Sequence, residues 1–95
     1  MKMDHVAIQV DDVRESVDWY VERFGCGIIY CDHTWALLQF DNIKLALVVE
    51  DEHPFHIAFE TEDILLGGSR HRDGSYSVYV DDPTGNKIEV INYEQ

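Results

Sequence analysis

Two short segments of the sequence begin with a histidine and resemble each other. His5-Val6-Ala7-Ile8 is echoed by His56-Ile57-Ala58-Phe59, so each histidine is followed by an aliphatic residue, an alanine and a large apolar residue. Acidic residues follow both segments. A repeat with a period of about fifty residues indicates two related modules. The two histidines therefore occupy equivalent positions, which favours a shared role.

Alternation along the expected strands brings these histidines to polar faces, and it does the same for a carboxylate near the end of the chain. Every second residue of a strand shares a face, and the polar faces of three strands carry His5, His56 and Glu89. Two neutral imidazoles and one carboxylate suit a divalent transition metal (Mn, Fe, Ni, Co or Zn) and leave positions for water or substrate oxygens. If the modules pair their first and last strands, the three can converge. A metal there could polarise a substrate or stabilise its oxyanion.

Other side chains on the same faces could act on a substrate. Glu60 shares a face with His56, Tyr79 lies on the penultimate strand, and either could act as acid or base. The candidate substrate-binding residues are Gln9, Trp35 and Ser77. A lone histidine near a strand start is more often structural than a metal ligand. This structural interpretation is assigned to His33, His53 and His71.

The elements that must position these residues follow a β-α-β-β-β pattern in the first half. A strand over Asp4–Val10 precedes a helix capped by Asp12, because aspartate is a good N-cap. The helix has an apolar stripe and stops at Gly25-Cys26-Gly27. Three strands follow, with Asp41-Asn42 as a hairpin turn between the last two. Their expected ranges are about Ile28–Cys31, Trp35–Phe40 and Ile43–Val49.

The second half restarts after the acidic stretch Glu50–Pro54, which is typical of a linker. Where the first half has a helix, this half has only Ile64-Leu65-Leu66 before Gly67-Gly68. Four strands are expected, over Phe55–Thr61, Ser69–Arg72, Tyr76–Asp81 and Lys87–Asn92. The fold class is therefore α+β. It consists of two βαβββ modules, the second abbreviated, over residues 1–50 and 54–95 of one domain.

The missing second helix leaves an apolar sheet face with too little to cover it, although Leu65 and Leu66 could cover part of it. This outer apolar face consists of Ile57, Phe59, Val78, Val80, Ile88 and Val90. Such a face predicts either another subunit over the sheet or an exposed patch. We favour a homodimer.

Charge and composition exclude several classes of function. The 95 residues carry a formal net charge of −12, which disfavours nucleic acid and anionic membranes because like charges repel. The charge could attract cationic ligands or metals, or it could serve solubility or a salty cytoplasm. No apolar run is long enough to cross a bilayer, and the N-terminus lacks a signal peptide's apolar region, so we expect a cytoplasmic protein. Cys26 and Cys31 are expected to be reduced and on opposite faces of one strand.

Three motifs resemble those of the vicinal-oxygen-chelate superfamily, which includes glyoxalase I, bleomycin-resistance protein and extradiol dioxygenase. The first is the opening His5-x-x-x-x-Val10-x-Asp12 with a helix ending at Phe24-Gly25, and the second is His56–Phe59. The third and most specific is the closing D-P-x-G-N-x-I-E-V of Asp82–Val90. The resemblance implies a cupped mixed sheet around a metal, with ligands on the first and last strands of the modules. By motif these are again His5, His56 and Glu89.

The sequence departs from glyoxalase I at the fourth ligand, where Ala46 stands in place of Glu or Gln. The remaining set is similar to that of extradiol dioxygenases and fosfomycin-modifying thiol transferases. Ser77-x-Tyr79-x-x-Asp82-Pro83 also resembles the strand of the latter. Those enzymes need cationic residues for a phosphonate, whereas this chain has seven basic residues in all. We therefore do not expect a phosphonate substrate.

Three functions remain open at this point. The first is a metalloenzyme for a small oxygenated substrate, of lyase, isomerase, dioxygenase or thiol transferase type. The second is a metal-free protein that sequesters a cationic drug, as in the bleomycin-resistance branch, for which the acidic charge, Trp35 and Tyr79 are suitable. The third is a degenerate scaffold without a ligand.

Overall fold

The single long helix of the first half begins and ends where local signals predict. Helix α1 covers Val13–Phe24, and the side chain of Asp12 accepts a hydrogen bond of 3.0 Å from the backbone N–H of Glu15. This bond satisfies one of the donors that a first helical turn leaves without a partner. Gly25 ends the helix at φ 68°, a left-handed conformation that a residue with a Cβ adopts only under strain.

The computed structural model describes residues 1–50 and 53–95. Asp51 and Glu52, in the middle of the expected linker, lie outside the described residues. The chain divides into two compact units. The N-terminal unit comprises His5–Phe55, and the C-terminal unit comprises Met1–Asp4 together with His56–Gln95. Within the described ranges, no helix is long and apolar enough to span a membrane.

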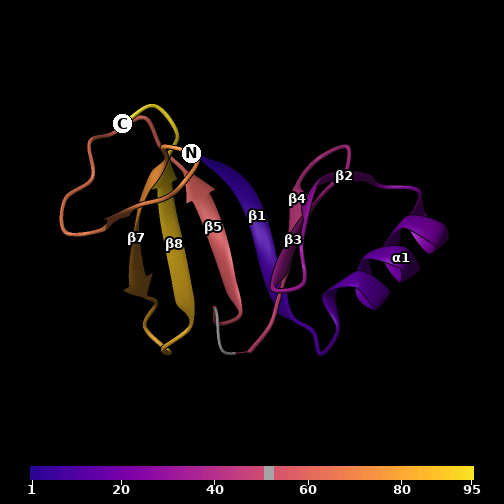
Figure 1. The fold of residues 1–95 in the computed structure, drawn as a ribbon. Coiled ribbons are helices and arrows are strands. Elements are labelled where there is room, and N and C mark those ends of the chain that lie inside the picture. The colour runs from indigo at the N-terminus through magenta and orange to yellow at the C-terminus, as the bar shows by residue number, and fades with distance from the viewer. Residues whose placement is uncertain (51–52) are drawn as a thin grey trace. The chain divides into compact units, whose positions relative to one another are not determined.

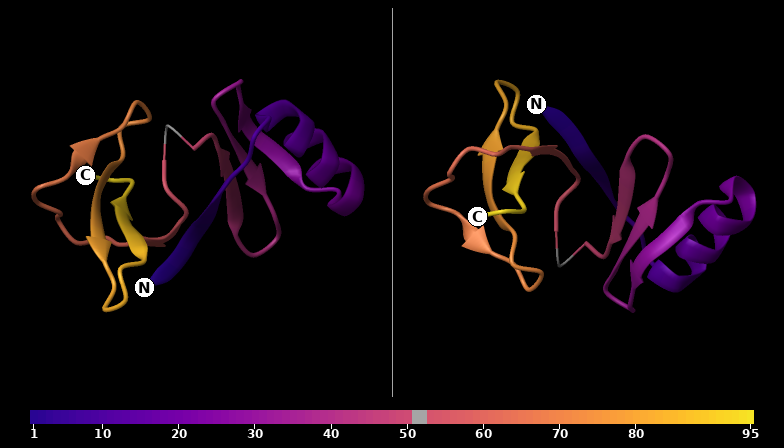
Figure 2. Two further views of the ribbon diagram at one scale, coloured as in Figure 1. Left: turned by 90° about the horizontal axis from the view of Figure 1, so that it is seen from below. Right: turned by 90° about the horizontal axis from the view of Figure 1, so that it is seen from above.

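The N-terminal unit packs α1 against a sheet with the strand order β2-β3-β4-β1. Strand β1 pairs in parallel with β4, and the other neighbours are antiparallel. Figures 1 and 2 show α1 lying along one face of β2, β3 and β4. The strands are β1 (Lys2–Gln9), β2 (Gly27–Cys31), β3 (Trp35–Gln39) and β4 (Lys44–Val48).

The core of this unit lies between the helix and the sheet. Val13 and Val17, from the predicted apolar stripe, are buried against β3 and β4, where Leu38 and Leu47 have no exposed surface. Phe24, at the end of the stripe, is 56% exposed. Both cysteines are free, as expected, but Cys26 precedes β2 and only Cys31 lies in it. The expectation that both lie on one strand was wrong, because the left-handed turn at Gly25 delays the start of β2.

The C-terminal unit is a sheet with the order β5-β8-β7-β6, in which β5 and β8 are parallel and the other neighbours are antiparallel. Lys2–Asp4, the first part of β1, belong to this unit and stand beside β5 in the strand order. The predicted α+β class with a mixed sheet is confirmed. The strands are β5 (His56–Glu60), β6 (Ser69–Arg70), β7 (Tyr76–Asp81) and β8 (Lys87–Asn92).

An irregular segment connects β5 to β6 where the first half has its helix, as the sequence predicts. The end of the chain holds this segment: Gln95 exchanges two hydrogen bonds with the backbone of Leu65, and Asn92 donates to the carbonyl of Asp63. Gly68 passes so close to β7 that a Cβ would overlap the carbonyl oxygen of Ser77. Leu65 is partly buried, but Leu66 is 85% exposed and covers nothing.

The strand register of the C-terminal unit separates two unlike faces. Ala58, Glu89 and Tyr79 lie in one row across β5, β8 and β7, whereas Phe59, Val90 and Val78 form a row on the other face. The outer apolar face is therefore present as expected. Its six side chains are partly exposed, and Val80 reaches 49%. The opposite face is the more deeply buried one, although it carries ionisable groups.

Candidate metal centre

The most buried ionisable pair of the C-terminal sheet joins its two parallel strands. His56 is the first residue of β5, and the register places Glu89 of β8 beside Ala58, on the same face as His56. The His56 Nε2 and Glu89 Oε1 atoms are 3.4 Å apart, and the two side chains are 4% and 6% exposed. A charge at this depth is costly unless it has a partner. The strand alternation seen in the sequence therefore produces a buried imidazole–carboxylate pair.

The second oxygen of Glu89 is held from the neighbouring strand. The Ser77 hydroxyl of β7 donates to Glu89 Oε2 over 2.8 Å. His71 Nε2, from the turn between β6 and β7, lies 2.6 Å from Ser77 Oγ and 3.7 Å from Glu89 Oε2. The contacts of Glu89 thus include His56 at one oxygen and both Ser77 and His71 at the other.

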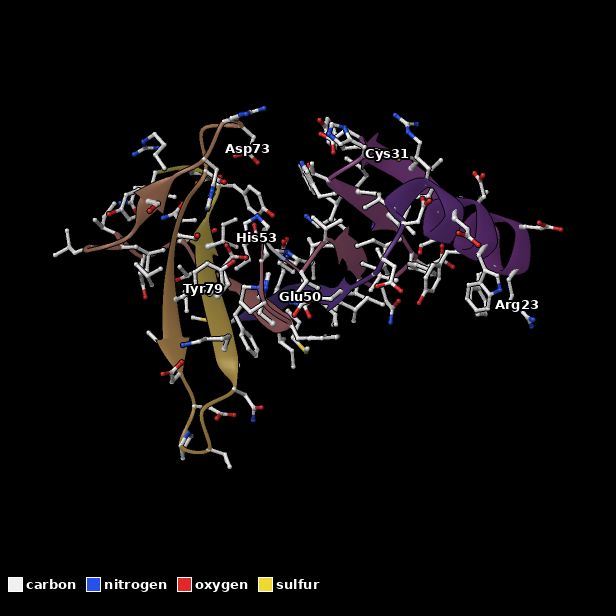
Figure 3. All side chains as sticks on the ribbon, turned by 60° about the horizontal axis from the view of Figure 1, so that its bottom comes forward. Arg23, Cys31, Glu50, His53, Asp73 and Tyr79 are labelled. Carbon is white, nitrogen blue, oxygen red and sulfur yellow. The ribbon has the colours of Figure 1, made fainter. Side chains whose placement is uncertain are left out.

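Tyr79 lies on the same face of the C-terminal sheet as His56 and Glu89. Tyr79 lies beside Glu89 in the register, and its ring stands perpendicular to the His56 ring with 5.3 Å between the centroids. Partial burial raises the pKa of the Tyr79 phenol, and the negative charge of Glu89 and a hydrogen bond with it raise this pKa further. The phenol is therefore protonated at neutral pH and can donate a hydrogen bond. Figure 3 labels Tyr79 on β7.

Glu60, the other acid–base candidate, lies at the far end of β5 from His56. It is partly buried and shares the face of His56, and the register places it beside Ile91, whose other neighbour is Ser77. Strand β8 therefore separates Glu60 from Ser77. The C-terminal unit thus brings together His56, Ser77, Tyr79 and Glu89, with Glu60 farther along the same face.

Three other predicted site residues belong to the N-terminal unit. Gln9 donates from Nε2 to the backbone oxygen of His53 over 3.0 Å, and Trp35 stacks on Tyr30 with 4.6 Å between ring centroids. His5 is half-buried in β1, where it follows Asp4 directly. Asp4 itself belongs to the C-terminal unit and accepts a hydrogen bond of 2.6 Å from the Tyr93 hydroxyl.

Ala46, which stands where the family resemblance implies a fourth ligand, is a buried residue of β4. Ala46 lies in the middle of β4, is 5% exposed, and stands beside Ala7 of β1 in the register. Neither alanine offers a donor atom to a metal. The middle of β4 therefore supplies no ligand at the position for which the family resemblance implied a fourth one.

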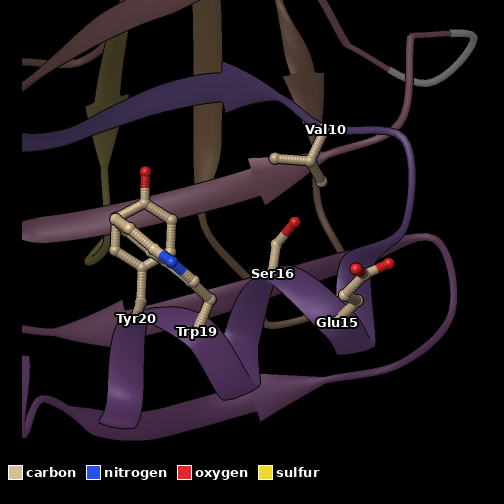
Figure 4. Close-up of a pocket in the computed structure, with 5 residues that line it drawn as sticks. All are labelled: Val10, Glu15, Ser16, Trp19 and Tyr20. Atoms are coloured by element: carbon tan, nitrogen blue, oxygen red, sulfur yellow. The ribbon is translucent and has the colours of Figure 1, made fainter. Parts of the chain in front are cut away.

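Two surface recesses of the N-terminal unit are lined by residues other than the predicted ligands. Figure 4 shows the recess between the end of β1 and α1. It is lined by Val10, Glu15, Ser16, Trp19 and Tyr20. A second recess is lined by Trp19, Glu22 and Arg23, and the Arg23 guanidinium lies over the Trp19 ring. Their exposed lining gives them no resemblance to a site for a buried metal.

Sequence reasoning assigned His71 a structural role and so missed its place beside Glu89. The Asp73-Gly74 turn was recognisable in the sequence, and the hairpin pairs Ser69 with Ser77. That register places the turn near β7. The proximity of His71 to Glu89 can therefore be recognised only once the pairing of β6 with β7 is known. Position along the chain alone could not distinguish His71 from His33 or His53.

Comparisons with known proteins show the family and the fold of the chain. The sequence model of the Glyoxalase/Bleomycin resistance protein/Dioxygenase superfamily matches residues 2–67. The chain is 28% identical to "Metallothiol transferase FosB" of Lysinibacillus sphaericus, over 92% of this chain and 79% of that protein. Solved structures of two epimerases share the fold. For methylmalonyl-CoA epimerase of Streptomyces coelicolor the TM-score is 0.76 at 18% identity, covering 100% of this chain and 99% of that one. For the Mycobacterium tuberculosis epimerase the TM-score is 0.73 at 18% identity, covering 96% and 87%.

Proposed function

Because the chain belongs to the glyoxalase/bleomycin resistance protein/dioxygenase superfamily, we propose that it is a divalent-metal-dependent enzyme acting on a small oxygenated substrate. The observation that carries this proposal is the buried pair of His56 and Glu89. Imidazole nitrogen and carboxylate oxygen are both suitable ligands for Mn, Fe, Ni, Co or Zn. A metal would also relieve the cost of keeping the Glu89 charge out of water.

We propose His5 as the third ligand. His5, His56 and Glu89 each offer one atom to a metal ion. The support for His5 comes from its equivalence to His56 in the repeat and from its place in β1, one residue beyond Asp4. Three protein ligands leave coordination positions open for a substrate, which distinguishes a catalytic site from a closed structural one.

The chain's own residues would bind the substrate and move its protons. When bound, the metal supplies a Lewis acid that stabilises negative charge developing on a substrate oxygen. The Tyr79 hydroxyl, whose hydrogen goes to Glu89 in this structure, could donate to such an oxygen only by leaving that bond, and Glu60 is the candidate base. Gln9 and Trp35 remain candidate substrate-binding residues. Ser77, predicted for the same role, has its hydroxyl hydrogen directed to Glu89.

The likeness to a metallothiol transferase favours a group-transfer reaction within this broad class. Two cations of the C-terminal unit already have partners, which argues against a phosphonate as the acceptor. Lys87 Nζ is 2.6 Å from Asp81 Oδ1, and both terminal nitrogens of Arg70 donate to backbone oxygens. We therefore infer a substrate with vicinal oxygens and little negative charge. The epimerase structures support the fold alone.

We also propose that the protein is a homodimer in which the outer apolar face is covered by a second copy. The support is the exposure of that face, including Val80 at 49%, and of Ile64 and Leu66 at 72% and 85% in the neighbouring segment. Apolar side chains gathered in this way mark interaction surfaces in soluble proteins.

Metal content tests the proposed function. Purified wild-type protein and a His5→Ala/His56→Ala double variant are compared by elemental mass spectrometry, with His33→Ala as the control. We expect a transition metal in the wild type and in the control but none in the double variant. Equal metal in all three proteins would contradict the site. Metal in none of them, combined with tryptophan quenching by a cationic glycopeptide, would instead favour the sequestering function.

A further inference from the structure

We propose that Ser77 and His71 are positioning residues that fix the carboxylate of Glu89. The chain of contacts runs from His71 Nε2 through Ser77 Oγ to Glu89 Oε2, with distances of 2.6 and 2.8 Å. This inference deepens the proposed function and rests on it, because Glu89 is there a metal ligand. Neither Ser77 nor His71 is itself a ligand in this arrangement.

The two hydrogen bonds that link His71, Ser77 and Glu89 run in one direction, from His71 to Glu89. A serine hydroxyl has one hydrogen, and in Ser77 that hydrogen goes to Glu89. The contact between His71 and Ser77 Oγ must then be donated by His71. The hydrogen-bonded series from His71 to Glu89 therefore requires a hydrogen on Nε2 of His71.

The effect on Glu89 is to make its two oxygens unequal. Oε2 accepts the bond from Ser77, whereas Oε1 lies 3.4 Å from His56 Nε2, and the Tyr79 phenol is hydrogen-bonded to the same carboxylate. A hydrogen bond to an ionised carboxylate is stronger than one between neutral groups, so it holds the carboxylate against rotation. Rotation would exchange the two oxygens in front of His56. Outer partners of this kind orient a metal ligand and typically contribute about 10–100-fold to metal affinity.

Hydrogen bonds in the turn around His71 fix the position of this residue. The backbone N–H of His71 donates to Ser75 over 2.7 Å, and its carbonyl accepts from Gly74 over 3.0 Å. Asp73, labelled in Figure 3, accepts from both the N–H and the hydroxyl of Ser75. Gly74 has φ 88°, which lets the turn close. His71 is 37% exposed, so the contacts from Glu89 through Ser77 to His71 connect a buried carboxylate with the surface.

Metal affinity tests the proposal through variants that keep or remove one contact. Co²⁺ binding is measured by calorimetry and by visible absorption for wild type, Ser77→Ala, Ser77→Thr, His71→Ala and, as a control, His33→Ala. We expect Ser77→Ala to weaken binding by about 10–100-fold and to change the Co²⁺ spectrum. Ser77→Thr retains the hydroxyl and should restore both, and His71→Ala should lie between these two. A purely structural role would leave the spectrum unchanged.

A second measurement needs no metal. Long-range ¹H–¹⁵N NMR of the metal-free protein reports the His71 tautomer, and we expect the hydrogen on Nε2 in wild type and a mixture in Ser77→Ala. A hydrogen on Nδ1 in the wild type would overturn the proposal, and so would wild-type Co²⁺ affinity in Ser77→Ala. If wild type itself bound no Co²⁺, the proposed function would fail, and the tautomer would still decide whether His71 and Ser77 hold Glu89. If Ser77→Ala does not fold, the Co²⁺ affinity and spectrum of His71→Ala are compared with those of wild type instead.

Discussion

Glu89 is a charged side chain that is only 6% exposed, and its contacts explain how the fold tolerates it. His56 approaches one oxygen, and Ser77 donates to the other. These partners offset part of the desolvation cost, and a divalent cation would offset more. The proposed ligand role of Glu89 therefore makes a prediction that can be separated from its structural role.

Glu89→Gln should abolish tight metal binding while leaving the fold intact. Glutamine keeps the size of the side chain but removes the negative charge that attracts a metal. We expect the loss in Co²⁺ affinity to exceed the roughly 10–100-fold that removal of an outer partner costs. Calorimetry measures the affinity and circular dichroism checks the fold, with the exposed Glu94→Gln as the matched control. Unchanged affinity in Glu89→Gln would exclude Glu89 as a ligand.

At the scale of elements, the first half of the closing D-P-x-G-N-x-I-E-V motif is a turn that joins β7 to β8. Asp82 Oδ1 accepts from the backbone N–H groups of Thr84 and Asn86, and Oδ2 accepts from the Asn86 side chain. Gly85 adopts φ 90°. The turn sets the register that places Glu89 beside Tyr79. The motif thus combines a turn with the proposed metal ligand that the turn positions.

Acid should weaken this turn. The hydrogen bonds from the Asn86 side chain, then its backbone N–H, hold the pKa of Asp82 below its ordinary value. A lowered folded pKa means that the stabilisation is present above about pH 4 and is lost as the pH falls through the folded pKa. Asp82→Asn should therefore be less stable than wild type at neutral pH, and the difference should shrink in acid. Urea unfolding from about pH 7 to about pH 2 measures this, with Asp18→Asn on the exposed side of α1 as the control.

The N-terminal cap of α1 makes a second prediction at this scale. Asp12→Ala removes the acceptor for the Glu15 N–H and should lower the free energy of unfolding by about 0.5–2 kcal/mol. Thermal or urea unfolding measures the change. The neighbouring Asp11 is exposed and lies outside the cap, so Asp11→Ala should change stability by less than about 0.5 kcal/mol. Equal losses in the two variants would show that charge, and not the cap bond, matters.

At the scale of the whole molecule, two opposing forces bear on association. The outer apolar face favours a second copy, because burial of apolar surface stabilises about 25 cal/mol per Å². The net charge of −12 opposes association, since two like-charged chains repel each other. Salt screens this repulsion but does not weaken apolar contact, so a dimer held by this face should be tighter at higher ionic strength.

Sedimentation at tens of micromolar should therefore show a dimer that Val80→Glu disrupts. The substitution places a charge in the outer apolar face and adds to the repulsion. Ile28→Glu is the matched control, because Ile28 is as exposed as Val80 but lies on β2 of the N-terminal unit. A strict monomer for wild type would remove the inference. If only Ile28→Glu disrupted the dimer, the interface would lie on the N-terminal unit and not on the outer apolar face.

The sequence by itself determined the features that depend on neighbouring residues. The cap at Asp12, the left-handed stop at Gly25 and the bounds of β7 and β8 follow from local hydrogen bonding, backbone freedom and period-two alternation. The same alternation placed His56 and Glu89 on the buried face, and the repeat and motifs indicated the superfamily. The three-ligand centre and the division into modules remain predictions.

Tertiary structure decided what depends on pairing between distant strands. The contact of His71 with Ser77 requires the β6–β7 register, which no local signal specifies. The exposure of Leu66 also follows from how the chain packs, because an apolar residue has no strict local preference for a buried position. The sequence thus proposed His5, His56 and Glu89 as ligand candidates, and long-range pairing decided which groups contact His56 and Glu89.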